Sequence, residues 1–441
     1  MFEPLAQFFS VVGWVFISYW QYIVPVALLF FTYVIHLDYK QGLFIRSWRP
    51  VCLAVSVPEL NLRTPFAMEQ FFAGMYGIRN DRDVIEQNWL GEFQEPFACE
   101  IIGTGGRVYF ILRPPHYLRD HTEAVIYAQY PEAEIVEVED YTQVIPPDVS
   151  SPNSGYELWG ADVDLTKSDA YPIRTYVDFE KMVSGQAPEA AVDPIANLVE
   201  VMSGLREGEQ IWFQIVASPA MDDWAQAGKA LVDKLIGKKA KKKPSFWDQG
   251  LGGALAELAE FVYKGITVAP FKPPEFEYPG AGSKEEPNVP PSLMQHISPG
   301  TQDMVKAIER NIAKKAFLSK IRVVTLAKKD ENGKYDAVRF KEFRAKVNGF
   351  LSQFTSVDLN DFVYKRKVSA HYWFPETRKN YRKNQILSEY KKRKLSAGKQ
   401  FYFNTEELAT MFHFPQVTVK SPKISWVESR KGKPPAGLPV K

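Results

Sequence analysis

The sequence predicts an α+β protein: an N-terminal transmembrane helix, two ferredoxin-like modules of the split βαβ type, and a mostly helical C-terminal region. Three observations support this fold class. Residues 4–37 carry no charged side chain, strand-like and helix-like apolar patterns alternate between residues 51 and 330, and the remainder is helical and basic. We expect four parts. They are a membrane anchor with its juxtamembrane segment (1–50), a first module (51–145), a second module (155–330) with an insertion at 238–300, and a basic helical region with an extended tail (331–441).

The predicted anchor is the uncharged segment 14–37. A helix needs about 20 apolar residues to cross a bilayer core of roughly 30 Å, and a proline is tolerated there as a kink. Lysine and arginine follow this segment and do not precede it, which predicts a single-pass protein with most of the chain in the cytoplasm. The alternative is a hydrophobic helix buried in a partner. The residues that we assign to the anchor are Trp14, Trp20, Pro25, Leu28, Phe30 and Leu37.

The first module follows the order β-α-β-β-α-β of a split βαβ fold. Its expected elements are a strand at 51–57, a helix at 65–78, strands at 97–102 and 108–112 joined by a glycine turn, a helix at 116–129, and a strand at 134–138. The second module has expected strands at 160–165, 172–177, 210–217 and 320–327, with helices at 193–205, 222–236 and 303–317.

The insertion in the second module joins a lysine cluster to an amphipathic segment and then to a proline-rich linker. This combination predicts a contact with anionic lipid. The alternative is a solvated charge run beside a helix that packs on its own domain. The predicted lipid-contact residues are Lys238, Lys239, Lys241, Lys242, Lys243 and Trp247.

Two segments of the C-terminal region are candidate interaction sites. One interleaves basic residues with aromatic ones, a pattern found in nucleic-acid-binding proteins but also in ordinary solvated helices. Its candidate nucleic-acid contacts are Arg378, Lys379, Arg382, Lys383, Lys391, Lys392 and Arg393. The other begins with a capping box at 404–407 and continues as a short apolar helix, which either docks a partner or packs into its own domain. Its candidate docking residues are Glu406, Glu407, Leu408, Met411, Phe412 and Phe414.

Composition and motifs argue against several other classes. The chain has 54 basic and 52 acidic residues, so no overall field points to nucleic acid. Its two cysteines, Cys52 and Cys99, suit a reducing compartment, and no Cys/His spacing fits a zinc site. The sequence contains neither a P-loop nor another catalytic signature, so we expect a protein that is not an enzyme and has no cofactor or metal. An active site assembled from distant residues stays open as an alternative.

Three phrases resemble a known family: YAQYPEAEI at 127–135, GEQIWFQ at 208–214 and NTEELATMFHFP at 404–415. They are similar to the pre-ATPase region of membrane-anchored, TraC-like ATPases of type IV secretion and conjugation. The motor domain of that family is absent from this sequence, so no catalytic residue carries over. The resemblance implies a membrane-anchored, non-catalytic scaffold at the inner (cytoplasmic) membrane that recruits a separate P-loop motor ATPase.

The resemblance also sets the expected partners, which are membrane lipid, the motor ATPase and, in the alternative reading, DNA. We expect the protein to be oligomeric within the secretion complex. The alternative function is a membrane-tethered nucleic-acid-binding protein that guides DNA to a translocation pore.

Overall fold

The computed structural model describes residues 3–58, 61–151, 154–181, 193–221, 223–237, 298–356 and 358–416. The chain divides into two compact units. The first comprises residues 1–49 and 80–95, and the second comprises residues 50–79 and 96–441.

The first unit consists of the long helix α1 (Glu3–Ser47) and a segment that contains the π-helical turn η2 (Glu86–Leu90). His36 Nε2 lies 3.2 Å from the carbonyl oxygen of Trp89, and the rings of the two residues are 4.8 Å apart. Phe44 packs edge-on against Phe93, with ring centroids 5.6 Å apart. These contacts tie the C-terminal half of α1 to residues 86–93.

The predicted transmembrane helix was wrong. Within the described part of the chain, no helix is both long and apolar enough to cross a membrane. The prediction relied on the absence of charge, but an uncharged segment is not necessarily apolar. Gln21, Thr32 and His36 place polar groups along α1, and Asp38 and Lys40 follow within the same helix.

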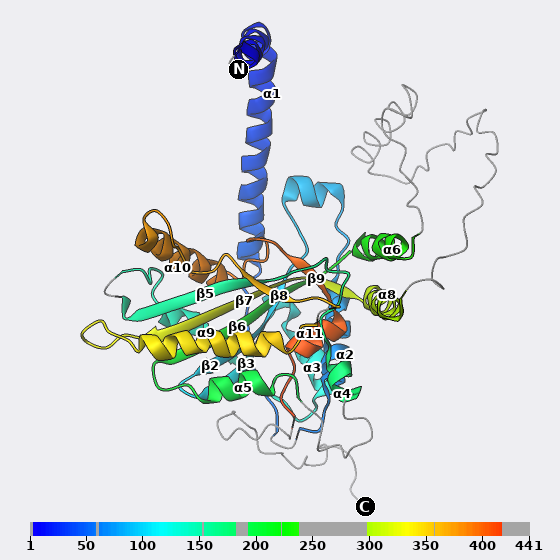
Figure 1. The fold of residues 1–441 in the computed structure, drawn as a ribbon, viewed down its shortest axis with the longest axis vertical. Coiled ribbons are helices and arrows are strands. Elements are labelled where there is room, and N and C mark those ends of the chain that lie inside the picture. The colour runs from blue at the N-terminus through cyan, green and yellow to red at the C-terminus, as the bar shows by residue number, and fades with distance from the viewer. Residues whose placement is uncertain are drawn as a thin grey trace, which may run out of the picture. The chain divides into compact units, whose positions relative to one another are not determined.

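The second unit is built on a nine-stranded antiparallel sheet (Figure 1). The strand order is β4-β1-β3-β2-β6-β7-β5-β8, with β9 paired to one end of β7. The strands are β1 (Cys52–Ser56), β2 (Phe97–Thr104), β3 (Arg107–Arg113), β4 (Glu134–Val138), β5 (Tyr156–Leu165), β6 (Glu209–Pro219), β7 (Ala316–Lys328), β8 (Phe362–Lys365) and β9 (Phe401–Asn404).

This sheet fits the α+β class but corrects the expectation of two separate modules. Each half has the strand order of a split βαβ fold, β4-β1-β3-β2 in one half and β8-β5-β7-β6 in the other. The halves merge because β2 and β6, the second strand of each half, pair antiparallel along eight residues from Phe97↔Ala217 to Thr104↔Gln210. We call this β2–β6 pairing the seam. Both strands are buried on both faces, which removes the edge that each isolated module would have.

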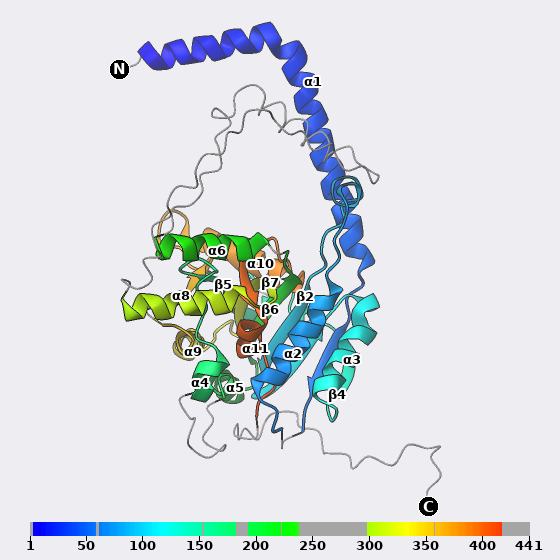
Figure 2. The same ribbon diagram turned by 90° about the vertical axis from the view of Figure 1, so that its right-hand side faces the viewer.

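Helices cover both faces of the sheet (Figures 1 and 2). The main core lies on one face, where α2, α3, α5, α9 and α11 pack, and α10 covers part of the other face. The helices are α2 (Pro65–Met75), α3 (Arg119–Gln129), α4 (Tyr176–Lys181), α5 (Ala196–Ser203), α6 (Asp223–Leu235), α8 (Pro299–Ile312), α9 (Ala337–Ser352), α10 (Pro375–Lys391) and α11 (Thr405–Met411), with 3-10 turns at Tyr76–Ile78, His116–Leu118 and Tyr141–Val144. Helices α6 and α8 pack on each other around a small separate apolar cluster.

Candidate functional site

The phrase at 404–415 forms the capped helix α11. Asn404 Oδ1 accepts a hydrogen bond from Glu407 N at 2.8 Å, and Glu407 Oε2 accepts one from Asn404 N at 3.0 Å. This reciprocal pair confirms the capping box that the sequence predicts. The cap satisfies two backbone donors that would otherwise be left unpaired in the interior.

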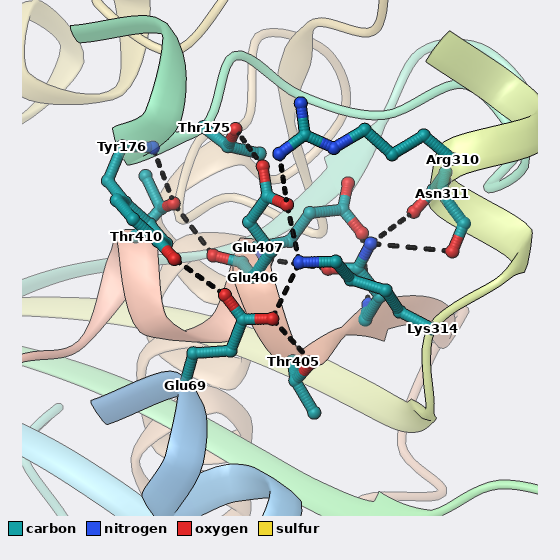
Figure 3. A network of polar contacts seen from close by, with 11 residues as sticks. Glu69, Thr175, Tyr176, Arg310, Asn311, Lys314, Thr405, Glu406, Glu407 and Thr410 are labelled. Atoms are coloured by element: carbon teal, nitrogen blue, oxygen red, sulfur yellow. Dashed lines mark hydrogen bonds and ion pairs between the residues drawn. The ribbon is translucent and has the colours of Figure 1, made fainter. Parts of the chain in front are cut away.

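Lys314 lies between two carboxylates beside α11 (Figure 3). Its Nζ donates to Glu69 Oε1 and to Glu406 Oε2, each at 2.6 Å, and Arg310 Nη2 donates to Glu406 at 3.0 Å. Burial alone would raise the pKa of Glu406, but the hydrogen bonds from Lys314 and Thr175 and the nearby positive charges lower it. This cluster of mutually paired side chains therefore connects α2, α11, the end of α8 and Lys314 just after it.

All six predicted docking residues lie in the interior. Glu406, Glu407, Leu408, Met411, Phe412 and Phe414 are each at most 4 % exposed. Phe412 and Phe414 pack edge-on against Phe110 of β3, with ring centroids 6.0 and 5.5 Å apart. The face that the sequence offers as a partner handle is therefore covered by the core of its own unit in this conformation, as the alternative reading has it.

Glu407 is the most deeply buried carboxyl of this region. Burial raises its pKa to about 8, although backbone N–H groups of Asn404 and Ile173 stabilise the charged form. It belongs to the cap of α11 and faces no cavity among those found in the described part of the chain. Its position suits a structural role in the core.

A second buried polar cluster lies at the centre of the seam. Glu100 of β2 and Gln214 of β6 face each other in the register, and Gln214 Nε2 donates to Glu100 Oε1 at 2.7 Å. Arg393 donates to Glu100 through Nε at 2.8 Å and to Asp140 through Nη1 at 2.6 Å. Tyr141 completes the cluster with a hydroxyl hydrogen bond of 3.0 Å to Glu100 Oε2. These contacts fasten the residues after α10 to the joint between the two halves.

The structure does not gather the seven predicted nucleic-acid contacts on one basic surface. Arg393 is buried in the seam cluster, and Lys383 forms an ion pair of 2.6 Å with Glu157. Lys379 pairs with Glu376 at 2.9 Å. Two others bond to backbone carbonyls, Arg382 to Ser369 and Lys391 to Ile145.

The remaining two basic residues of that set are exposed. Arg378 Nη1 donates to the carbonyl of Tyr372 at 3.1 Å, and Lys392 lies on the surface beyond α10. Within the described residues, no ion pair joins either side chain to a carboxylate. Three of the seven side chains are therefore neutralised by carboxylates and two more are held by backbone carbonyls, so the set does not offer seven free charges to a phosphate-driven interface.

Among the described residues of the second unit, the most exposed aromatic side chains directly precede α10. Tyr372, Trp373 and Phe374 are 75 %, 84 % and 76 % exposed, and we call them the aromatic turn. Trp373 and Phe374 have φ values of 33° and 53°, a left-handed conformation that is unfavourable for residues with a Cβ. The sequence places these rings beside the basic residues but does not show that they point outward.

Strand β4 is an exposed edge of the sheet. It pairs with β1 on one side, and no strand of the described sheet lies on its other side. Val136 and Val138 are on the same face of β4 and are 48 % and 36 % exposed. We call this strand and its two valines the β4 edge. Sequence alone missed it because alternation marks a strand without showing which strand ends a sheet.

The two predicted lipid-facing sets are placed differently. Lys238, Lys239, Lys241, Lys242, Lys243 and Trp247 lie outside the described residues. The anchor residues belong to α1, in which Trp20, Pro25, Leu28 and Phe30 are exposed and Leu37 is half-buried, while the side chain of Trp14 lies outside the described part.

Metal-binding and reactive groups are not prominent in the described part of the chain. No group of three or more His, Cys, Asp or Glu residues there is arranged to hold a metal ion. Burial raises the pKa of the Cys52 and Cys99 thiols, which disfavours the reactive thiolate. A groove of about 530 Å³ between α6 and α8 is lined mainly by apolar residues, with Lys229, Asp233 and Glu309 as its charged members.

Comparison with known proteins identifies a family but no characterised relative. No curated protein matches this chain. The model of a family described as a domain of unknown function, DUF8128, matches residues 83–427. The matched region contains eight of the nine strands, from β2 to β9, and both sides of the seam. The chain therefore belongs to the DUF8128 family.

Proposed function

We propose that this protein is a non-catalytic scaffold subunit of a type IV secretion or conjugation machine and that it docks a separate P-loop motor ATPase. The proposal is supported by the three phrases that resemble the pre-ATPase region of TraC-like proteins. It is also supported by the sequence itself, in which no residues match the G-x-x-x-x-G-K-[ST] pattern that cradles ATP phosphates.

The observation that carries the proposal is the β4 edge. Of the three phrases, the one at 208–214 lies in the buried strand β6 and the one at 404–415 is buried with α11. The phrase at 127–135 instead leads from α3 into β4 and so reaches the surface. An exposed edge strand offers backbone donors and acceptors to a partner strand, and exposed valines add apolar contact area.

The charges on β4 indicate how this edge is protected when no partner is bound. Glu134 and Glu137 belong to the same strand, and Glu137 forms an ion pair with Arg119 of α3. Charged side chains on an edge discourage indiscriminate pairing between strands. A partner that offers complementary positive charge beside an apolar strand is therefore selected over a second copy of β4.

Site-specific photo-cross-linking tests the proposal in cells that contain the whole secretion machine. A photoreactive residue at position 136 is expected to cross-link to a P-loop ATPase, identified by mass spectrometry. The matched control is position 338, because Val338 is also an exposed valine but lies on α9. If the yield of cross-linked ATPase is the same at both positions, or if no ATPase is cross-linked at position 136, the β4 edge is not the docking surface. Purified protein that hydrolyses ATP by itself would contradict the non-catalytic role.

A further inference from the structure

We propose that the aromatic turn binds single-stranded nucleic acid by stacking bases on its exposed rings, with Arg378 contacting a phosphate. This inference goes beyond the docking function and concerns a different surface, since the turn precedes α10 whereas docking is assigned to the β4 edge.

Exposure of these rings is exceptional for this fold. In the described part of the second unit, Phe71, Phe72 and many other large aromatic side chains are buried, whereas Tyr372, Trp373 and Phe374 are consecutive and each more than two-thirds exposed. A contiguous apolar patch on a protein surface usually marks a binding site, because water solvates it poorly. Tyr381, in the second turn of α10, is exposed as well.

The backbone holds the rings in one arrangement. Two consecutive residues with positive φ cost on the order of 1 kcal/mol each, so the surrounding contacts must enforce this conformation. Arg378 and Arg382 do so by donating to the carbonyls of Tyr372 and Ser369, and Pro375 starts the helix directly after the turn. A turn fixed in this way loses little conformational entropy when a ligand binds.

The composition of the patch favours bases over lipid or an apolar protein surface. Arg378 and Tyr381 are three residues apart and therefore share one face of α10, and Phe374 is the residue directly before this helix. The set combines exposed aromatic rings with one exposed arginine and has no aliphatic side chain, which matches the surfaces on which successive bases stack while a guanidinium contacts the backbone. The nearby carboxylate of Glu376 is paired with Lys379, which offsets its repulsion of phosphate.

The contacts of the other basic residues, which engage carboxylates or backbone carbonyls in most cases, predict a weak dependence of binding on salt. Each phosphate contact to a single strand contributes about −0.7 to the slope of log affinity against log salt concentration. Lys379 and Lys383 of this helix are paired with carboxylates, whereas Arg378 is exposed and forms no ion pair with a described carboxylate. We therefore expect a shallow slope close to that of one or two phosphates, with most of the affinity supplied by stacking.

Fluorescence anisotropy of a labelled oligothymidylate tests this inference with the full chain. Trp373→Ala should weaken binding about 5- to 100-fold, the range for losing one stacked base, without changing the salt slope. Arg378→Gln should reduce the slope by about 0.7. Phe66→Ala on α2 removes another exposed ring and Lys392→Gln removes an exposed charge outside the patch, so both control variants should bind normally. Trp373→Gly serves as a second variant that tolerates the positive φ, which separates loss of the ring from loss of the fold.

Several outcomes would overturn the inference. They are equal binding of the wild type and Trp373→Ala, equal competition by double-stranded DNA, or a steep salt slope that Arg378→Gln leaves unchanged. Binding of anionic lipid vesicles in place of the oligonucleotide would assign the turn to a membrane surface. None of these results affects cross-linking at position 136, so the docking proposal is tested separately.

Discussion

Replacing Arg393 with methionine tests whether the seam depends on its buried ion pairs. The guanidinium makes hydrogen bonds of 2.6 to 3.2 Å to the carboxylates of Glu100 and Asp140. Methionine preserves much of the aliphatic volume but removes every donor. The variant therefore leaves the fully buried Glu100 without its positive partner.

The magnitude follows from what remains around Glu100. Removing one partner of a buried ion pair typically costs about 3–5 kcal/mol of unfolding free energy. Glu100 retains hydrogen bonds from Tyr141 at 3.0 Å and Gln214 at 2.7 Å, which stabilise its carboxylate. We therefore expect the lower end of the range, about 3 kcal/mol. The neighbouring exposed Lys392 provides the control, since Lys392→Met should change stability by less than about 0.5 kcal/mol.

The dependence of the unfolding free energy on pH in the acid range gives a second, independent readout. Burial alone would raise the pKa of Asp140, but hydrogen bonds and charge from Arg393 lower it to about 2. A carboxyl whose pKa is depressed in the folded state stabilises the protein above its unfolded value and loses that contribution as the pH falls from about 4 to about 2. This contribution is roughly 1–2 kcal/mol after allowance for solvent screening. The stability gap between wild type and Arg393→Met should narrow by that amount over the same pH window.

Urea unfolding, followed by circular dichroism near neutral pH and in acid, measures both effects. The comparison requires equal m-values, because a changed slope signals a changed denatured state or an intermediate. If Arg393→Met lowers the unfolding free energy by less than about 1 kcal/mol, the reasoning is refuted, because a buried carboxylate without its positive partner should destabilise the protein by more than that. If the difference in unfolding free energy between the two proteins stays constant in acid, the low pKa of Asp140 is not caused by Arg393.

Two further predictions concern the core. Because burial raises the pKa of Glu407 to about 8, the folded state favours its neutral form. Its contribution to stability is full below about pH 4.5 and is lost as the pH rises through about 8, by up to about 5 kcal/mol, so Glu407→Gln should flatten a plot of urea midpoint against pH in that window. Gly103→Ala should lower stability by about 1–3 kcal/mol in thermal unfolding, because the added Cβ would lie 2.6 Å from the Cβ of Met202. Gly77→Ala is its control, as nothing lies within 4 Å of a Cβ there, and equal losses in the two glycine variants would contradict the steric explanation.

Local patterns in the sequence predict the elements of the first half well. The glycine turn between β2 and β3, the helix that begins at Pro65 and the strand at 134–138 all occur in the expected order. These elements are specified by nearby residues: alternation for strands, helical spacing for α2, and glycines with positive φ at the turn. Local physics is sufficient to predict them.

The seam could not be predicted in the same way. Strands β2 and β6 are both buried on both faces, and such a strand shows no alternation that would reveal its neighbour. Pairing Phe97 with Ala217 depends on the whole sheet and not on either segment.

The predicted strand at 172–177 was wrong for a related reason. Its backbone is held by side chains from α11, as in the bond from Tyr176 N to Thr410 Oγ1, so it does not form a strand.

The candidate sites show the same limit. A basic residue in a sequence looks available for a ligand until its partner is known, and the carboxylate that pairs with Arg393 belongs to Glu100, nearly three hundred residues earlier. Conversely, three adjacent aromatic residues look like core until the structure shows their exposure. Long-range pairing decides which charges and rings remain on the surface.

The seam also has a consequence for how such a chain is assembled. Antiparallel pairing of equivalent strands from two equivalent halves is the geometry of a two-fold symmetric dimer, in which each subunit offers the same edge to the other. The second unit can be regarded as such a dimer enclosed in one polypeptide. The linkage keeps the two edges together at any protein concentration and lets the halves diverge. The second half differs from the first in that it carries α6, α8, α10 and α11, whereas the first half is a sheet with the two helices α2 and α3.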